Sequence, residues 1–357
     1  MNRVPNVESF RNIPVIDSHV HMSHPISLDR SVEYLNKIIE GRNYRSIVLA
    51  PYSVDGDHFT DKQAAIKSLY LKHRIPGIYA QATLNYNHNS GDTSDFFLSQ
   101  VKEHYKLGFD GEKLLEGKPD TYRRLGHGID DPVYDGFYEF CEENRFPITL
   151  HVADPPSFWD PDKVSEYAKK VGWFYADPSF PTREELYRQV WNVMNRFPAL
   201  PLILAHFGFL SDLPDMSEEF LTRWKNTALD LTPGGWIFSC FSDKHDYWRD
   251  FFVRHSSRIV FGTDSYNTPE DYNSTGGCTG LWALVRSCLE FSEPFLWNDS
   301  LGTLVPLGLD DETLHDIYNR NSRRIFGENP AAIDIERADF AAHITSDTLA
   351  GPHDKRD

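Results

Sequence analysis

The sequence predicts an α/β fold, a (β/α)8 TIM barrel with long loops at the carboxyl ends of its strands. Eight short β-rich segments recur along the chain, and several are nearly continuous apolar runs. Parallel strands that are buried on both faces have this composition. Helical patterns lie between the segments, and eight alternations of strand and helix are typical of this barrel. The length of 357 residues suffices for one such barrel with insertions.

The expected strands follow from these runs in chain order. They cover residues 15–21, 46–52, 77–84, 111–117, 147–153, 201–207, 228–233 and 259–265. Since a strand of a parallel barrel has neighbours on both sides and helices outside, an apolar run with few charges is the expected signal.

Helices are expected between the strands. Before the fifth strand, spacing of i, i+3, i+4 and i+7 places four side chains on one helical face: Tyr134, Phe137, Tyr138 and Cys141. The run Thr182-Arg183-Glu184-Glu185 predicts a capping box that opens a helix, and Pro198 ends it. A last helix is expected over residues 311–326, closed by Gly327.

We expect a single domain over residues 12–330, followed by a polar tail, 331–357, that is only loosely held. Two connections are too long to be plain turns, namely residues 154–181 and residues 266–280. Both leave carboxyl ends of strands, where barrel enzymes keep their active sites. We interpret them as lids or substrate walls; ordinary surface insertions are the alternative.

Composition excludes several classes of function. The net charge of −17 leaves no basic stripe to replace the counterions of nucleic acid. No apolar run approaches the ~18 residues of a membrane span, and residues 1–11 lack the apolar core of a signal peptide. The four cysteines form no CxxC pair and no disulfide framework. A reducing cytoplasm is therefore the expected location.

The most informative motif is His19-Val20-His21, at the end of an apolar run. In a strand, residues i and i+2 point to the same face, so the pair forms half of a metal site. Three later runs also end in a metal-capable side chain, namely His151, His206 and Asp264. One such residue is more often structural, and Asp264 after Gly-Thr also suits a helix N-cap. The recurrence at one place of a repeated unit predicts a metal centre.

The expected ligands are His19, His21, His151 and Asp264, which offer three imidazole nitrogens and one carboxylate oxygen. This set suits one divalent ion, Zn²⁺ first and Mn²⁺ second. Asp264 is also expected to accept a proton from the water that the ion activates. His206 is expected to act as acid or base, or to polarise a carbonyl.

The chain resembles the amidohydrolase superfamily, in the amidohydrolase-related branch that contains hydrolases and α-amino-β-carboxymuconate-semialdehyde decarboxylase. The likeness rests on Asp17-Ser18-His19-Val20-His21, Leu150-His151, Leu204-Ala205-His206-Phe207-Gly208, Phe261-Gly262-Thr263-Asp264-Ser265 and Ile317 to Gly327. It implies that the two histidines of the first motif, His151 and Asp264 hold one divalent metal, usually zinc. It implies an acid–base or carbonyl-polarising role for His206, and it leaves a homodimer open.

Lys113, on the fourth expected strand, has three interpretations. An ammonium that binds a substrate carboxylate or carbonyl is preferred, because this branch is mostly mononuclear. In binuclear relatives the corresponding lysine is a carbamate that bridges two metals, and a structural role is the third. Further candidates for substrate contact are Arg123, Arg124, Phe158 and Trp159. For the aromatic residues, packing is the alternative.

Two reactions fit these residues. The first is hydrolysis of an amide, lactone or related bond of a small molecule. The second is non-oxidative decarboxylation of a carboxylated aromatic or enoic acid, with Lys113, Arg123 or Arg124 binding the carboxylate. Some decarboxylases of the branch carry Glu where this chain has His19, which favours hydrolysis or the semialdehyde decarboxylase type. A non-catalytic barrel is the third hypothesis, and the intact set of site residues counts against it.

Overall fold

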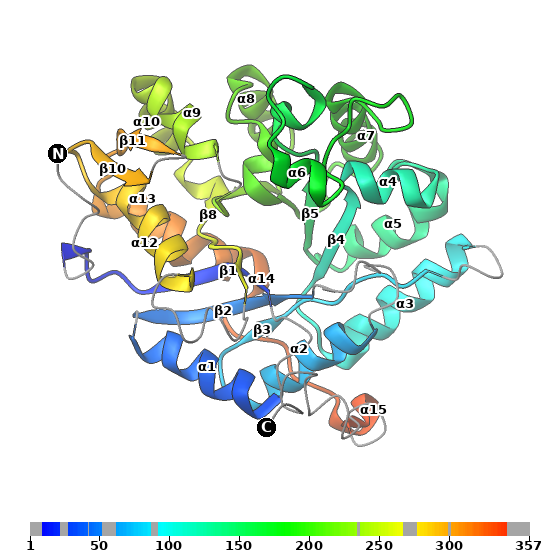
Figure 1. The fold of residues 1–357 in the computed structure, drawn as a ribbon. Helices are drawn as coiled ribbons and strands as arrows, with labels where there is room; N and C mark the ends of the chain where they lie inside the picture. The colour runs from blue at the N-terminus through cyan, green and yellow to red at the C-terminus, as the bar shows by residue number, and fades with distance from the viewer. Residues whose placement is uncertain are drawn as a thin grey trace, which may run out of the picture.

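The computed structural model describes residues 9–21, 28–41, 43–51, 62–86, 92–233, 236–266, 277–298 and 301–340. Helices lie outside a ring of short strands, as α3, α5, α7 and α8 do beside β4 and β5 (Figure 1). The strands are β1 (Val15–His21), β2 (Tyr44–Ala50), β3 (Tyr79–Ala80), β4 (Glu112–Gly117), β5 (Ile148–Val152), β6 (Leu202–Leu204), β7 (Thr227–Asp230), β8 (Ile259–Val260) and β9 (Ser265–Tyr266).

All pairings among these nine strands are parallel. They form one sheet in the order β3-β2-β1-β9 and a second in the order β4-β5-β6-β7-β8. A parallel bridge between Ala82 and Glu112 joins the chain after β3 to β4. The amide of Ser18 in β1 donates to the carbonyl of Phe261, directly after β8, at 2.9 Å. The two sheets therefore meet at both edges, which confirms the predicted eight-stranded barrel.

The eighth strand is interrupted. The expected run 259–265 appears as β8 and β9, and between them Asp264 has a left-handed backbone with φ of 55°.

The sixth strand is shorter than expected. It ends at Leu204, and residues 205–209 form a tight turn, so the strand predicted over 201–207 is wrong for its last three residues. Their side chains are buried like those of a strand, but the backbone is not extended.

The helices are α1 (Leu28–Gly41), α2 (Lys62–Arg74), α3 (Ser94–Leu107), α4 (Pro119–Leu125), α5 (Asp135–Glu143), α6 (Glu166–Lys170), α7 (Arg183–Arg196), α8 (Pro214–Arg223), α9 (Ile237–Asp243), α10 (His245–Arg254), α12 (Gly277–Glu290), α13 (Asp311–His315), α14 (Asn321–Phe326) and α15 (Ile335–Ala338). A π turn, Asp316–Arg320, joins α13 to α14 over the span expected for the last helix. A small antiparallel hairpin consists of β10 (Phe295–Asn298) and β11 (Gly302–Leu304).

The helix start predicted for α7 is present, with Thr182 as its N-cap. The amide of Glu185 donates to the hydroxyl of Thr182 at 3.2 Å, and the helix ends before Pro198. One apolar face of α7 packs into the core through Leu186, Val190 and Met194. The four side chains expected on the helix before β5 are also buried, Tyr134 in a 3-10 turn and the other three in α5.

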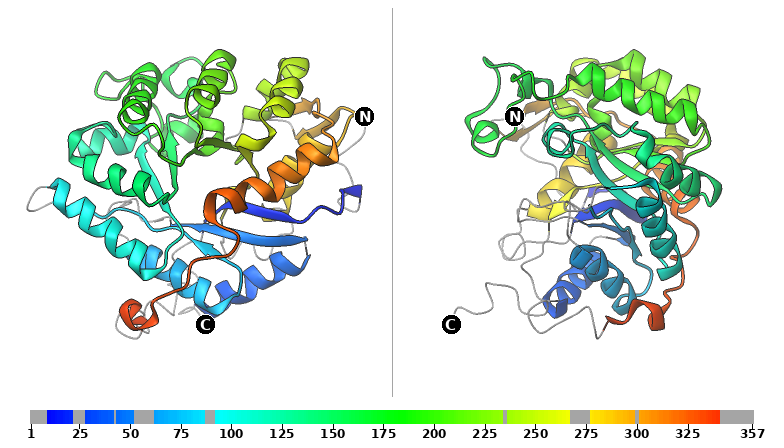
Figure 2. Two further views of the ribbon diagram at one scale, coloured as in Figure 1. Left: turned by 180° about the vertical axis from the view of Figure 1, so that it is seen from behind. Right: turned by 90° about the vertical axis from the view of Figure 1, so that its right-hand side faces the viewer.

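The segment 154–181 carries the 3-10 turn Pro156–Trp159 and α6, and it stands out in green from one side of the molecule (Figure 2, right). Most of the second expected lid, residues 267–276, lies outside the described residues. The first residues of the expected tail contact the rest of the fold. The amide of Ala331 donates to Asp110 at 2.7 Å, Ala338 is buried, and α15 lies near α3. Most of residues 331–340 are nevertheless exposed, and residues 341–357 lie outside the described part. Among the described residues, no helix has the length and apolarity to cross a membrane.

Candidate metal centre

Pairing of β1 with β9 brings His19, His21 and Asp264 together at one end of the barrel. His21 pairs with Tyr266 in register, and the amide of Asp264 donates to the carbonyl of His19 at 3.0 Å. Two backbone contacts thus hold the acidic residue beside the histidine pair. The left-handed conformation of Asp264 costs about 1–2 kcal/mol relative to ordinary backbone, so the surrounding contacts must impose it.

Three side-chain atoms converge there. The Nε2 atoms of His19 and His21 are 3.1 Å apart, and Oδ1 of Asp264 lies 3.0 Å from the second and 3.8 Å from the first. Both histidines are buried, and 14% of the Asp264 side chain is exposed. Of the described residues, these are the ones whose His, Cys, Asp or Glu ligand atoms gather closely enough to hold a metal ion.

The protonation of the two rings follows from their other contacts. Nδ1 of His19 lies 2.8 Å from a carboxylate oxygen of Asp230, and Nδ1 of His21 lies 3.1 Å from the carbonyl oxygen of Ala50. Carboxylates and carbonyls only accept, so we assign the proton of each neutral ring to Nδ1. Burial, together with the charge of Lys113, lowers the pKa of His19 to about 4. Its Nε2 therefore carries a lone pair near neutral pH.

The convergence consequently places two imidazole lone pairs and a carboxylate oxygen against one another. Oδ1 of Asp264 accepts no well-formed hydrogen bond from the described residues. Three electron-pair donors at these distances repel one another unless a cation lies between them. Imidazole nitrogen and carboxylate oxygen are ligands that zinc and its neighbours accept. The residues present thus fit a divalent cation.

His151, at the end of β5, lies outside this close group. Its Nε2 faces the carbonyl of Ala153 at 3.0 Å and a carboxylate oxygen of Asp154 at 3.2 Å. Both are acceptors, so the proton of the neutral ring belongs on Nε2 and the lone pair on Nδ1. Burial lowers the pKa of His151. Its ring packs edge-on against that of His206, with 4.8 Å between centroids.

His206 lies in the turn after β6, and not on the strand where the sequence places it. Four consecutive residues, 206–209, have left-handed backbone, with φ of 55°, 56°, 60° and 50°. Three of the four carry side chains, for which this conformation is costly. The hydroxyl of Tyr187 donates to the carbonyls of Gly208 and Phe209 at 2.9 and 3.0 Å, and Arg183 donates to the latter at 2.8 Å. These contacts from α7 hold the strained turn.

The imidazole of His206 has a defined partner. Its Nδ1 lies 3.1 Å from the hydroxyl oxygen of Thr232, which itself donates to Oδ1 of Asp230 at 2.5 Å. Because the hydroxyl proton is already used, Nδ1 of His206 donates and Nε2 carries the lone pair. Burial lowers the pKa of His206 to about 3, so the ring is neutral. The ring centroid lies 5.7 Å from that of His19.

Asp230 is the residue that the sequence analysis missed. Its Oδ2 accepts from His19, and its Oδ1 accepts from the amide of His206 at 2.7 Å and from Thr232. Burial opposes ionisation, but contacts with His19, His206 and Thr232 prevail and lower the pKa of Asp230 to about 2. A signal was available, because an acidic residue inside the apolar run 228–233 requires a buried partner.

Lys113 is buried on β4, with 1% of the residue exposed. Its Nζ has no hydrogen-bond partner among the described residues. Burial lowers the pKa of Lys113 to about 8, and the charges of Asp230 and Asp264 oppose that shift. A largely protonated ammonium therefore lies within electrostatic reach of the close group, with no ligand of its own in the described part of the chain.

The remaining predicted substrate contacts lie around the segment 154–181. Arg123 and Arg124 are exposed on α4, and the guanidinium of Arg123 lies 4.0 Å from the ring centre of Phe180. Phe158 stacks on Trp173 at 6.0 Å, and the indole of Trp159 donates to the carbonyl of Pro181 at 3.0 Å. Both aromatic residues therefore pack within the segment. Their contact with substrate stays a prediction.

A second buried network joins this segment to His151. The carboxylate that receives the Nε2 proton of His151 belongs to Asp154, which also accepts from Lys118 at 2.5 Å and from the hydroxyl of Tyr175 at 2.7 Å. The ammonium of Lys118 lies 4.6 Å from the ring centre of Trp173. The orientation of His151 and the position of the segment are therefore linked through one carboxylate.

Solved structures share the fold at low sequence identity. The 4-oxalomesaconate hydratase of Rhodopseudomonas palustris superposes with a TM-score of 0.53 and 14% identity, covering 92% of this chain and 98% of its own. An uncharacterised TIM-barrel protein of Bordetella bronchiseptica gives 0.51 and 12%, with coverages of 91% and 99%. A 2,6-dihydroxybenzoate decarboxylase in complex with 2,6-dihydroxybenzoate gives 0.50 and 15%, with coverages of 88% and 99%.

At the level of sequence, no curated protein matches the chain. The family model described as amidohydrolase matches residues 95–327, well over half of the chain. The matched region contains His151 in β5, His206 after β6 and Asp264 between β8 and β9. With the barrel fold and the convergent donor atoms, this match shows that the chain belongs to the amidohydrolase family, whose enzymes depend on metal ions.

Proposed function

We propose that the chain is a hydrolase that uses one divalent ion to direct water against an amide, lactone or related bond of a small molecule. The observation that carries the proposal is the convergence of lone pairs on His19, His21 and Asp264 within 3.0–3.8 Å. Zn²⁺ is the first choice and Mn²⁺ the second. His151 is the fourth proposed ligand, through the Nδ1 lone pair that its contacts leave available.

The ion, when bound, supplies a Lewis acid toward water and toward a carbonyl oxygen. Asp264 accepts a proton from the attacking water and passes it to the leaving group. His206 enters the reaction with a lone pair on Nε2, so we assign it the base side of the acid–base role in preference to polarisation of a carbonyl. Lys113 binds a carboxylate or carbonyl of the substrate, because its buried ammonium has no partner among the described residues.

Non-oxidative decarboxylation is the second candidate, and the same lysine favours it. A buried ammonium near two proton acceptors suits a substrate that carries a carboxylate. The hydratase and the decarboxylase that share this fold are named for substrates that carry carboxylates, 4-oxalomesaconate and 2,6-dihydroxybenzoate. Hydrolysis remains our first proposal because Asp264 and His206 are both proton acceptors at rest, as activation of water requires.

The two reactions separate in a substrate screen. Purified enzyme loaded with Zn²⁺ is assayed on lactones, amides and carboxylated aromatics, with released acid and released CO₂ measured in parallel. We expect acid from a lactone or an amide, loss of activity with a chelator and recovery with Zn²⁺. Release of CO₂ from a carboxylated aromatic, with no hydrolysis, would reverse the order of the two candidates.

Changing either His21 or Asp264 to alanine is expected to remove bound metal together with turnover, because each supplies one of the converging donor atoms. Metal content by elemental analysis is the measurement. His315→Ala, a change in α13 that is not part of the close group, serves as the matched control and should retain the metal. Full metal content in the first two variants would contradict the assignment of the centre.

His206→Ala is expected to leave the metal bound and to lower kcat by ~10²–10⁴-fold, the usual contribution of a general acid or base. Steady-state kinetics and metal analysis of the same preparation give both quantities. Loss of the metal in this variant would make His206 a ligand, and unchanged kcat would remove it from the mechanism.

Tyr187→Phe is expected to lower kcat by ~10-fold or more with little change in metal content, because a small misplacement of a reacting group is costly. The variant removes the hydroxyl that holds the carbonyls of residues 208 and 209, so Tyr187 is a positioning residue for His206. Tyr70→Phe is the control, because among the described residues the hydroxyl of Tyr70 accepts from the exposed Arg74 and does not support the turn. Equal kcat in the two variants would show that the turn needs no such support.

A further inference from the structure

A cleft of about 270 Å³ lies at the end of the barrel opposite the candidate metal centre. Its walls come from residues that precede β4, β5, β6 and β7 and from the segment around the end of α14. Strands of a parallel barrel all point the same way, so residues before the strands and residues after them lie at opposite ends. The cleft is therefore separate from the site described above.

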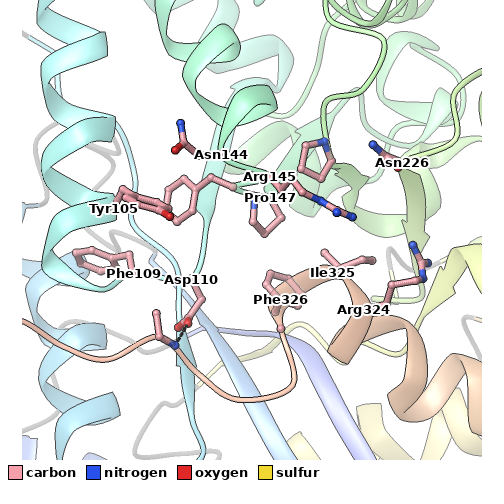
Figure 3. A pocket seen from close by; sticks show the side chains of 14 residues that line it. Tyr105, Phe109, Asp110, Asn144, Arg145, Pro147, Asn226, Arg324, Ile325 and Phe326 are labelled. Carbon is pink, nitrogen blue, oxygen red and sulfur yellow. Dashed lines mark hydrogen bonds between the residues drawn. The ribbon is translucent and has the colours of Figure 1, made fainter.

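One end of the cleft is basic. The guanidinium groups of Arg145 and Arg324 lie at this end, close to the amide of Asn226 (Figure 3). Arg145 makes no side-chain hydrogen bond or ion pair with any described residue, and Arg324 donates to the carbonyl of Ser257 at 2.5 Å. Burial lowers the pKa of Arg324, Asp316 opposes the shift, and the charge of Arg145 adds to it. Both side chains are exposed, so solvent and salt weaken the repulsion between the two cations.

The acid that also lines the cleft does not neutralise them. Asp110 accepts from the ammonium of Lys72 at 2.6 Å and from the amides of Ala80 and Ala331 at 2.7 Å each. These three donors satisfy the carboxylate of Asp110, which lies at the other end of the cleft from the arginines (Figure 3). Asp316, the acid that opposes the pKa shift of Arg324, is itself paired with Arg320 at 3.1 Å. Neither arginine of the cleft forms an ion pair within the described part of the chain, although the full chain has a net charge of −17.

Arg145 also occupies a backbone position that favours glycine. It follows the last turn of α5 with φ of 52°, a left-handed conformation that is costly for a side chain without a local hydrogen bond. A glycine or asparagine would end the helix at lower cost. The left-handed backbone and the absence of an ion pair to Arg145 among the described residues both point to a use for this guanidinium beyond the fold.

Apolar side chains form part of the wall. Phe109, Phe146, Pro147 and Phe326 line the cleft beside the basic end. We propose that the cleft binds a small anion, whose phosphate or carboxylate group lies between Arg145 and Arg324 and whose apolar or aromatic body lies along these side chains. Arginine pairs suit this role, since the planar guanidinium binds such groups through two parallel hydrogen bonds.

The test is calorimetric titration of the full-length protein, as purified, with phenyl phosphate, inorganic phosphate and benzoate. We expect phenyl phosphate or benzoate to bind more tightly than inorganic phosphate, because only the first two reach the apolar wall. Arg145→Gln and Arg324→Gln should each weaken binding by ~10-fold or more, as loss of a charge-assisted hydrogen bond implies. Arg249→Gln, the same change at an exposed position on α10, should not.

Thermal unfolding separates binding from a structural role. Arg145→Gly relieves the left-handed strain, so its unfolding temperature should equal or exceed that of the wild type while binding is weakened. A lower unfolding temperature without a change in affinity would assign Arg145 to the fold and overturn the proposal. Absence of binding by all three anions, or affinities that the two cleft variants leave unchanged, would overturn it as well.

Discussion

The carboxylate of Asp230 is the constraint on which the candidate site depends. One oxygen receives the Nδ1 proton of His19, and the other receives the backbone amide of His206 and the hydroxyl of Thr232. The first contact directs a lone pair of His19 toward His21 and Asp264. The others hold the start of a strained turn and, through Thr232, set which nitrogen of His206 carries a proton. A single buried charge thus orients both the metal-facing and the proton-accepting parts of the site.

Strained backbone marks the ends of three strands around this charge. Ala153, His206 and Asp264 have φ of 59°, 55° and 55°, and each follows or interrupts a strand of the barrel. Such conformations persist only where surrounding contacts over-determine them. Here the contacts come from other elements, from Tyr187 and Arg183 in α7 and from the pairing of β9 with β1. Contacts within the barrel hold these residues in left-handed conformations, and the conformations set the directions of the His206 and Asp264 side chains.

The two ends of the barrel carry different kinds of side chains. Lone-pair donors and Asp230 gather at the carboxyl ends of the strands, within electrostatic reach of Lys113, which lies inside the barrel near the start of β4. Two arginines and several apolar side chains form a cleft at the amino ends. Seen from behind, the last helices cross the barrel, and α15 lies beyond them (Figure 2, left). The first part of the tail meets Asp110, which also lines the cleft, so this end is completed by the C-terminal part of the chain.

The sequence by itself determined the barrel and most of the candidate residues. Apolar runs and helical periodicity depend on local spacing, and parallel strands buried on both faces leave a strong compositional signal. His19 and His21 share a face because residues i and i+2 of any strand do. That Asp264 joins them follows from the parallel order of the strands, which brings their carboxyl ends to one rim.

Only the tertiary structure decided how these side chains are used. The tautomers depend on Ala50 at the end of β2 and on Asp230 and Thr232, at and just after the end of β7, two other places in the chain. The turn that carries His206 continues the apolar pattern of β6. The sequence pattern therefore did not indicate that the extended backbone ends at Leu204. His151 shares its strand-end position with the close group, yet its contacts turn its Nε2 toward Asp154. Side-chain orientation is set by long-range contacts, and no periodicity in the sequence records them.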